Sequence, residues 1–425
     1  MTWQPDRECM DRGELEQLQL ERLEATLNRV QRSVPFYRAR FAGLGFDAEG
    51  LRSLDDLRRL PFTTKQDLRD NHPYGLFAVP LRDVVRVHAS SGTTGLATAV
   101  GYTRNDLERW SDLVARVLVA GGVGKDDVVQ VAFDYGLFTG AFGFHQGAER
   151  IGASVIPVSS ASPRRQLEIM RDYRSTALVC TPSHARTLAA AAREAGIEPG
   201  ALSLRSGLFG AEPWPESVRT ELQAGLKLVA TDNYGLSEVG GPGLSGECVE
   251  RRGLHVAEDH FLVEVVDPET LAPVPDGTVG ELVVTTLTRE AVPVIRFRTR
   301  DLASITRVPC ACGRTLARMS RVRGRTDDLI LVKGARFFPS EIEAALLEVA
   351  GVGPDWEVVL ERRDGRDEAR VRVESDTPGE DALRSAAERR LAADLGVTLP
   401  VELVPLRSIG RAGSKARRVI DRRGG

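Results

Sequence analysis

The sequence from residue 128 to residue 231 contains VVQVAF (128–133), SVIPV (154–158), ALVCT (177–181) and KLVAT (227–231), with longer segments before and between these runs. Each run is short and rich in β-branched residues, which is typical of a strand. Helical spacing of apolar residues covers 105–119, 141–151, 164–172 and 183–195. Strands that alternate with helices predict an α/β domain with a largely parallel sheet.

Outside this region the pattern changes on both sides. Residues 14–34 carry apolar side chains at steps of three and four, which predicts an amphipathic helix ending at Val34-Pro35. Residues 84–88 and 98–102 alternate as strands do. Residues 261–306 hold short β-runs separated by Pro, Gly and Asp turns, which predicts an antiparallel or barrel-like subdomain.

The chain changes character again near Asp327. Ser340-Glu341-Ile342-Glu343 has the pattern of a capping box that opens a helix. Residues 357–374 alternate around Asp364-Gly365, as in a hairpin. A helix follows at 380–396, and VELVPL (401–406) predicts the last strand. We therefore predict a large N-terminal domain, residues 1–326, and a small α+β C-terminal domain, residues 327–425.

Composition excludes several classes of protein. The chain has 425 residues, 42% of them hydrophobic and 28% charged, with a net charge of −3. This is ordinary globular composition, without the basic excess expected of a nucleic-acid-binding protein. No apolar run approaches the roughly 18 residues of a membrane span. Residues 1–17 lack the apolar core of a secretory signal. We expect a cytoplasmic protein that binds neither nucleic acid nor membrane.

Residues 90–95 read SSGTTG, and Ser91, Thr93 and Thr94 supply hydroxyl donors in a flexible loop. Such a loop suits a polyphosphate. The Walker pattern is absent, since it requires Gly-Lys-Ser/Thr and a helix, and Leu96 follows Gly95 here. A simple polar hairpin turn remains an equal alternative for this segment alone.

Two further segments carry polar side chains at the ends of strand-like runs. Residues 232–238 read DNYGLSE after KLVAT, and Asp301 follows VPVIRFR (292–298) within Thr299-Arg300-Asp301. Tyr234 could stack on a base, Ser237 could donate to a phosphate, and Glu238 is a hard oxygen ligand suited to Mg²⁺. Asp301 could accept bonds from both ribose hydroxyls. Taken singly, the first segment reads as a turn and Asp301 as a surface residue.

Lysine is scarce in this chain, because only Lys65, Lys125, Lys227, Lys333 and Lys415 occur among 57 basic residues. Lys415 lies in GSKARRV (413–419) near the end of the sequence. A lysine is a compact charge on a flexible stem, which can follow charge as it moves in a reaction. A solvated basic C-terminus is the alternative.

Together, these segments resemble the adenylate-forming (ANL) superfamily and, within it, the phenylacetate-CoA ligase family of aryl-CoA ligases. The resemblance runs from about residue 15 to residue 423. It is carried by LRSLDDLRRLPFTTKQDLRDNHPYGLFAVP (51–80), VHASSGTTG (87–95), YGLFTGAFGFHQGAERIGASVIPVS (135–159), LFGAEPWPE (208–216), DNYGLSEVGGPG (232–243), GLHVAEDHFLVEVVDP (253–268) and GRTDDLILVKGARFFPSEIE (324–343). This chain has Leu96-Ala97 where the family usually has Lys-Pro.

The resemblance implies an ATP-dependent aryl-acid–CoA ligase that forms an aryl-adenylate and then a CoA thioester. It implies an N-terminal AMP-binding domain with α/β and β-rich subdomains, followed by a mobile lid. The acceptor could instead be a carrier-protein thiol or an amine. A homodimer is also expected from the resemblance.

The resemblance also implies residue roles. Nucleotide binding is expected of Ser91, Thr93, Thr94, Ala211, Glu212, Asn233, Tyr234, Gly235, Ser237, Asp301 and Arg325, and Mg²⁺ binding of Glu238. Phe133 and Phe138 would line the pocket for the aromatic ring, and Lys415 would contact the carboxylate and the α-phosphate. The lid would turn about Asp327 and bring Lys333 and Arg336 to the site for the CoA step.

A separate pattern indicates a metal. Cys248 and His255 form C-x6-H, and Cys310 and Cys312 form a later C-x-C within Pro-Cys-Ala-Cys-Gly. Three thiolates and one imidazole make a closed tetrahedral set that suits structural Zn²⁺. Buried or incidental cysteines are the alternative.

Overall fold

The computed structural model describes residues 1–89, 98–353, 355–363, 366–406, 408–409 and 418–423. The chain forms two compact units built from interleaved segments. Unit 1 comprises Met1–Cys180, Gly200–Ala211 and Lys227–Arg321, and unit 2 comprises Thr181–Pro199, Glu212–Leu226 and Val322–Gly425. The sequence-based boundary at 326/327 stays a prediction.

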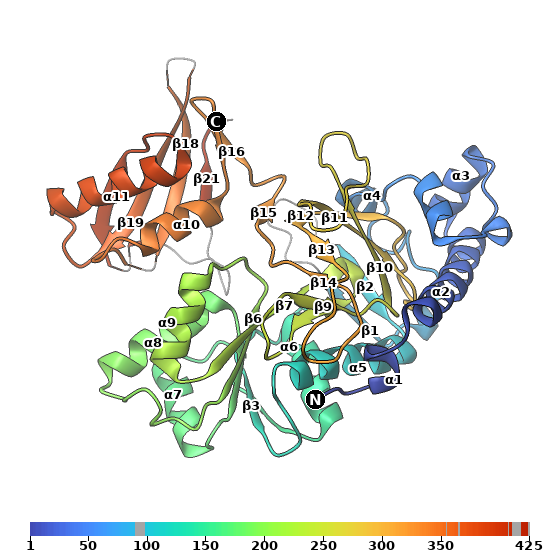
Figure 1. The fold of residues 1–425 in the computed structure, drawn as a ribbon, viewed down its shortest axis with the longest axis horizontal. Coiled ribbons are helices and arrows are strands. Elements are labelled where there is room, and N and C mark those ends of the chain that lie inside the picture. Colours follow the sequence, from blue (N-terminus) through green and yellow to red (C-terminus); the bar gives the residue numbers. More distant parts are fainter. Residues whose placement is uncertain (90–97, 354, 364–365, 407, 410–417, 424–425) are drawn as a thin grey trace. The chain divides into compact units, whose positions relative to one another are not determined.

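The central sheet of unit 1 confirms the predicted parallel strands (Figure 1). The four apolar runs form β3 (Val128–Val131), β4 (Ser154–Pro157), β5 (Ala177–Cys180) and β7 (Val229–Leu236), joined by β6 (Ser206–Gly210). These five strands are mutually parallel in the order β7-β6-β5-β3-β4. Beyond β7, the sheet continues antiparallel through β8 (Gly241–Glu247), β9 (Leu254–Val256), β14 (Arg318–Met319) and β13 (Ile305–Thr306).

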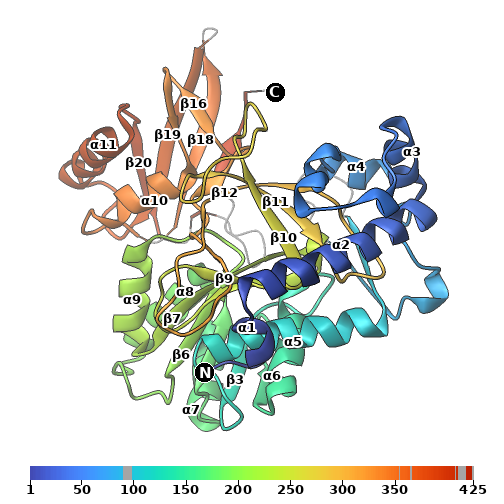
Figure 2. The same cartoon turned by 45° about the vertical axis from the view of Figure 1, so that its right-hand side comes forward.

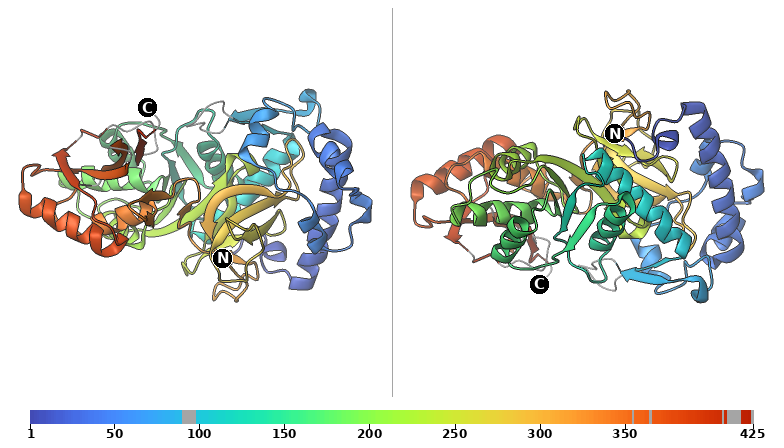
Figure 3. Two further views of the ribbon diagram at one scale, coloured as in Figure 1. Left: turned by 90° about the horizontal axis from the view of Figure 1, so that it is seen from above. Right: turned by 90° about the horizontal axis from the view of Figure 1, so that it is seen from below.

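Helices α5 (Arg104–Ala120) and α6 (Gly140–Ile151) pack against each other and against β8. In Figure 3 these two helices are drawn in teal. Their apolar faces bury Val114, Leu118 and Phe144 in the core that also contains β3. Helix α5 begins at a capping box in which the Thr103 hydroxyl accepts from the Asp106 backbone N–H. The predicted helix spacing therefore buries the expected face. Helix α7 (Pro163–Asp172) follows β4.

The predicted N-terminal helix is confirmed as α2 (Arg12–Ser33), and α1 (Pro5–Glu8) precedes it and α3 (Pro35–Gly43) follows it. Polar side chains of α2 bond to backbone carbonyls at residues 258 and 287. Figure 2 shows the course of the helix itself. The Gln19 amide donates to the Glu258 carbonyl at 2.8 Å, and the Thr26 hydroxyl donates to the Leu287 carbonyl at 2.9 Å. These bonds fix the helix along unit 1.

The predicted β-rich subdomain is antiparallel. It contains β10 (Phe261–Val266), β11 (Gly280–Thr286) and β12 (Phe297–Ala303), adjacent in that order. A separate two-stranded sheet pairs β1 (Arg86–Ala89) with β2 (Ala99–Tyr102) on either side of residues 90–97. None of the helices within the described ranges is long and apolar enough to cross a bilayer.

Unit 2 contains a four-stranded sheet in the order β20-β19-β18-β21, formed by β18 (Trp356–Arg363), β19 (Arg366–Ser375), β20 (Val401–Pro405) and β21 (Val419–Asp421). The hairpin expected around residues 364–365 is confirmed by the antiparallel pairing of β18 with β19. The prediction that VELVPL is the last strand was wrong, because β21 pairs in parallel with β18. The unit also contains α8 (Pro182–Glu194), α9 (Glu216–Leu226), α10 (Pro339–Leu347), α11 (Asp381–Leu395) and β15 (Gly324–Arg325).

Helix α10 begins earlier than the predicted capping box. Pro339 is its first residue, and the Glu341 carboxylate accepts from the Phe338 backbone N–H at 2.7 Å. Proline is favoured at the first helical position because its missing N–H is not needed there. Glu343 instead accepts a bond from Arg418 at 3.1 Å.

Candidate active site and cysteine–histidine cluster

Tyr234 and Asp301, both expected at the nucleotide site, meet in unit 1. Tyr234 lies on β7 and Asp301 on β12, 67 residues further along the chain. The Tyr234 hydroxyl donates to Asp301 Oδ2 at 2.6 Å, and Asp301 is 5% exposed. Its backbone N–H donates to the Thr299 hydroxyl at 3.0 Å. A carboxylate held in this way retains further acceptor positions for other donors.

The end of β7 turns sharply into β8, and this turn requires the glycine at 235. A Cβ on Gly235 would collide with the backbone oxygen of Gly241. The Asn233 amide donates to the Phe209 carbonyl of β6 at 2.8 Å, so this side chain joins two strands. The Ser237 and Thr139 hydroxyls lie 3.3 Å apart, which links the turn to the residue before α6.

Glu238 follows in the short 3₁₀ helix Ser237–Val239 and is 7% exposed. Its Oε1 lies 4.0 Å from the Nζ of Lys65, the first residue of α4 (Lys65–Asp70). The sequence alone did not assign a role to Lys65. Its scarcity as a lysine was the available signal, but 173 positions separate it from Glu238.

Ala211 and Glu212 form the turn after β6. Ala211 adopts the left-handed conformation, with φ of 70°, which is uncommon for a residue other than glycine. The Ser183 backbone N–H donates to Glu212 Oε1 at 2.7 Å. Burial raises the pKa of Glu212, and the bonds from Ser183 oppose that rise.

Arg325 and Asp327 form a two-pronged ion pair in unit 2. Arg325 Nε and Nη2 donate to the two carboxylate oxygens of Asp327 at 2.9 and 3.0 Å. Further along, β16 (Ile330–Val332) and β17 (Ala335–Phe337) are joined by Lys333-Gly334, with φ of 52° and 83°. Two successive positive φ values are those of the tight hairpin turn that favours glycine. This turn presents Lys333 to solvent.

Phe133 and Phe138 lie near each other, with ring centroids 6.3 Å apart. Phe133 is 2% exposed and stacks on Phe144 at 6.1 Å, so it belongs to the core of unit 1. The role of both rings toward a substrate stays a prediction. Ser91, Thr93, Thr94 and Lys415 lie outside the described residues.

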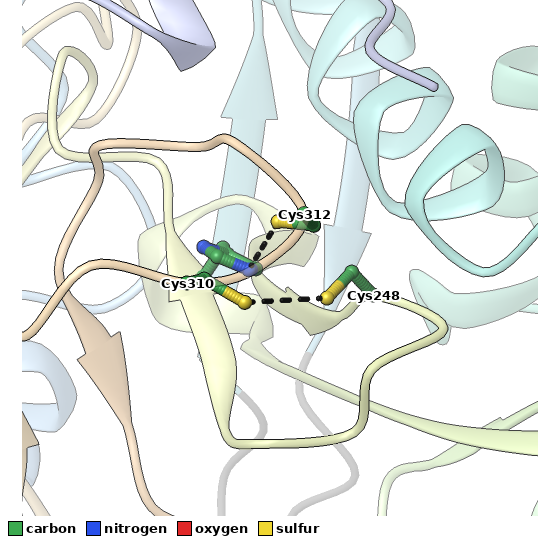
Figure 4. A group of neighbouring side chains, drawn as sticks. Cys248, Cys310 and Cys312 are labelled. Atoms are coloured by element: carbon green, nitrogen blue, oxygen red, sulfur yellow. Dashed lines mark hydrogen bonds between the residues drawn. The ribbon is translucent and has the colours of Figure 1, made fainter.

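The four predicted metal ligands come together in unit 1 (Figure 4). Cys248 Sγ lies 3.8 Å from Cys310 Sγ, and Cys312 Sγ lies 3.4 Å from His255 Nε2. All four ligand atoms lie within 4.8 Å of one another. A tetrahedral zinc with Zn–S bonds of about 2.3 Å separates its sulfur ligands by about 3.8 Å. A disulfide would require about 2.05 Å between sulfurs.

The surroundings of the cluster hold it in place. Gly313, with φ of 87°, closes a tight turn in which its N–H donates to the Cys310 carbonyl at 3.0 Å. Burial, with the charges of Arg314 and Arg318, lowers the pKa of His255 to about 3. The imidazole is therefore neutral near pH 7, which is the form that binds metals.

A buried ion pair that the sequence did not indicate supports the same turn. Arg314 Nε donates to Glu8 Oε2 at 2.6 Å, and both side chains are 2% exposed. The Thr315 N–H donates to the Glu8 carbonyl at 3.1 Å. These contacts join the N-terminal segment to the cluster loop.

Comparison with known proteins places this geometry in a family. The model for AMP-binding enzymes matches residues 48–288, and the model for the AMP-binding enzyme C-terminal domain matches residues 334–423. The phenylacetate-coenzyme A ligase of Thermus thermophilus is 46% identical, over 100% of this chain and 100% of that protein. The phenylacetate-coenzyme A ligase of Escherichia coli is 44% identical, over 96% of this chain and 95% of that protein.

A solved structure agrees over nearly the whole chain. It is 2-hydroxyisobutyryl-CoA ligase in the postadenylation state with R3-HIB-AMP, 32% identical, with a TM-score of 0.91 over 99% of this chain and 92% of that one. The same ligase with 2-HIB-AMP and CoA in the thioesterification state gives a TM-score of 0.75 at 33% identity, over 99% of this chain and 92% of that one. Its acyl-adenylate and CoA complexes belong to the reaction type that the sequence pattern predicts. The chain belongs to the AMP-binding, adenylate-forming enzymes, and among them to the phenylacetate-CoA ligase family of acid–CoA ligases.

Proposed function

We propose that this protein joins an aromatic carboxylic acid to coenzyme A at the expense of ATP, which is converted to AMP and pyrophosphate. The full-length similarity to phenylacetate-coenzyme A ligases carries the proposal, because two of these enzymes are 46% and 44% identical over 100% and 96% of this chain. In the first half-reaction the carboxylate attacks the α-phosphorus of ATP. In the second, the CoA thiol attacks the acyl-adenylate and AMP leaves.

The first half-reaction must bring an anion to a polyanion, and the chemistry of the proposed site residues suits that task. The Tyr234 ring would stack on the adenine, and the Asp301 carboxylate beside it would accept from the ribose hydroxyls. Glu238 offers the oxygen ligand that Mg²⁺ prefers, and bound Mg²⁺ would neutralise phosphate charge. Lys415 would contact the carboxylate and the α-phosphate, where a mobile ammonium offsets the growing charge.

The second half-reaction needs a different set of partners. We propose that the C-terminal domain turns about Asp327, withdraws Lys415 and brings Lys333 and Arg336 toward the CoA. The hairpin turn at Lys333-Gly334 holds the Lys333 side chain exposed, which suits contact with a phosphate-bearing acceptor. The two complexes of 2-hydroxyisobutyryl-CoA ligase, named for the postadenylation and thioesterification states, support such a two-step scheme.

An aromatic acid is the substrate class that we propose, on the full-length similarity to phenylacetate-coenzyme A ligases. Tyr135 and Phe142 meet edge to face with centroids 5.3 Å apart, close in sequence to Phe133 and Phe138. Aromatic rings prefer such offset or edge-to-face contacts. These rings pack on the core of unit 1.

The first prediction concerns the reaction itself. With MgATP, purified protein should release pyrophosphate with phenylacetate, benzoate or a hydroxy- or aminobenzoate, and CoA should then drive AMP release. The measurement is pyrophosphate and AMP release for each acid, with and without CoA. Absence of pyrophosphate release with every acid would refute the ligase function. AMP release driven by a carrier protein or an amine, but not by CoA, would favour the alternative acceptor.

We also propose that Cys248, His255, Cys310 and Cys312 hold a structural Zn²⁺. Four protein ligands leave no open position, so the ion would stabilise the fold and take no part in the chemistry. The 3.8 Å and 3.4 Å ligand separations support this proposal. We also propose a cytoplasmic location, where ATP and CoA are available as substrates. The cytoplasm is reducing, so cysteine thiols there stay free of disulfides and can bind a metal.

A further inference from the structure

We propose that Lys65 binds the terminal phosphates of ATP and the departing pyrophosphate, acting beside Glu238, the proposed Mg²⁺ ligand. This inference rests on the proposed ligase function and adds a residue to it. It would make Lys65 a second ammonium of the reaction, besides Lys415, and one that acts in the adenylation half alone.

The backbone that carries Lys65 is fixed from both sides. Thr63 forms a bridge beside the start of β12, with its N–H donating to the Arg296 carbonyl at 3.0 Å and its carbonyl accepting from the Arg298 N–H at 2.9 Å. The Thr63 hydroxyl also donates to the Ile295 carbonyl at 2.6 Å. The backbone next to Lys65 is therefore held beside β12, the strand that carries Asp301.

The start of α4 is fixed as well. The Thr64 N–H donates to Asp67 Oδ2 at 2.7 Å, and the two residues form a capping box. Arg40 donates to Asp67 Oδ1 at 2.7 Å, which anchors the helix to α3. Of this segment, the Lys65 side chain keeps freedom to move, since it is 40% exposed.

The ion pair between Lys65 and Glu238 is a poor source of folding stability. At 4.0 Å, with the lysine partly in solvent, such an ion pair contributes little to folding. Glu238 is nevertheless only 7% exposed, and burying a carboxylate costs free energy that close partners must offset. The Lys65 ammonium and the Glu238 carboxylate lie side by side, 4.0 Å apart. They could therefore act together on a magnesium polyphosphate, the carboxylate binding the metal and the ammonium binding a phosphate.

The charge of the reactants points to the same conclusion. The sequence of residues 90–97 is SSGTTGLA, which contains no cationic side chain. Hydroxyl and N–H donors orient phosphates, but phosphate-binding loops normally add a lysine for the β- and γ-phosphates. Lys65 is a cation of the right type beside the carboxylate expected to hold the metal.

The test compares Lys65→Gln with Lys125→Gln, which removes a similar charge from an exposed position elsewhere in unit 1. Calorimetry of full-length protein with Mg-pyrophosphate and with MgATP should show binding weakened roughly 10- to 100-fold in Lys65→Gln, as expected for one lost charge-assisted contact. Adenylation should slow with it. Conversion of synthetic phenylacetyl-adenylate and CoA to thioester should change less than about twofold, because that step involves no pyrophosphate.

Three outcomes would overturn the proposal. Pyrophosphate binding by Lys65→Gln could equal that by Lys125→Gln, both half-reactions could slow equally, or Lys65→Arg could fail to recover any binding. Thermal unfolding of each variant identifies any that does not fold. Pyrophosphate binding is measured without an acid, so it tests the role of Lys65 independently of the ligase function. The ligase function would be refuted only if the wild-type protein activated no acid.

Discussion

Replacement of Asp301 by alanine should reduce the rate of adenylation by about 10²- to 10⁴-fold, as expected for the loss of two charge-assisted hydrogen bonds to the ribose. Asp301 is placed for this by the Tyr234 hydroxyl, 2.6 Å from its Oδ2, and by its burial at 5% exposure. Both half-reactions hold the AMP moiety, so thioester formation from synthetic acyl-adenylate should fall as well. The measurements are pyrophosphate exchange and single-turnover thioester formation.

Tyr234→Phe is the matched control for this prediction. It keeps the ring that would stack on adenine and removes only the hydroxyl that contacts Asp301. Its activity should fall less than about tenfold, as expected for the loss of one hydrogen bond. An Asp301→Ala protein that unfolds at the wild-type temperature and keeps full exchange activity would remove Asp301 from the nucleotide site. An equal loss in Tyr234→Phe would assign the main role to the hydroxyl.

The sequence predicted the fold well where local pattern and tertiary structure agree. The runs at 128–133, 154–158, 177–181 and 227–231 became parallel strands because their β-branched residues suit a buried sheet. Helix α10 begins at Pro339, one residue before the predicted capping box at Ser340. Proline is favoured at the first position of a helix. Strand β21 was not predicted because three residues are too few to show the alternation of apolar and polar side chains that marks a strand. These residues form a strand because they pair with β18.

Candidate site residues could be proposed from the sequence where the chemistry shows in a short motif. Tyr234, Glu238 and Asp301 were proposed because polar residues follow apolar strands. The structure brings Tyr234 and Asp301 into contact, and the roles of all three stay predictions. The contact of Lys65 with Glu238 could not be found in this way, since it depends on how the turn before α4 lies beside β12. Long-range contacts of this kind are set by packing and leave no local pattern in the sequence.

The buried ion pair of Arg314 and Glu8 illustrates the same limit. Neither residue lies in a motif, and 306 positions separate them. Their 2% exposure shows that the pair forms only because the N-terminal segment folds onto the cluster loop. The spacing C-x6-H with C-x-C was enough to predict the cluster. It could not indicate the Arg314–Glu8 ion pair that supports the cluster loop.

Removal of the metal from the cysteine–histidine cluster should give the second large effect. Purified protein should contain about one zinc per chain, and a strong chelator should lower the free energy of unfolding by more than about 4 kcal/mol, because structural zinc binding contributes directly to folding. The cluster joins the loop of Cys248 to the turn at Cys310. The ion pair of Arg314 with Glu8 in the N-terminal segment also holds this turn. Elemental analysis and thermal unfolding, with and without chelator, measure both quantities.

Cys310→Ser and Cys9→Ser separate the metal from the cysteine itself. Cys310 is 8% exposed in the cluster, whereas Cys9 is exposed and outside it. Cys310→Ser should lose the zinc, unfold at a lower temperature and respond little to chelator, because no metal remains to be removed. Cys9→Ser should keep the wild-type zinc content and the full response to chelator. If wild-type protein contains no metal after expression with added zinc, and chelator leaves its unfolding temperature unchanged, then Cys248, His255, Cys310 and Cys312 form only a packed group of side chains.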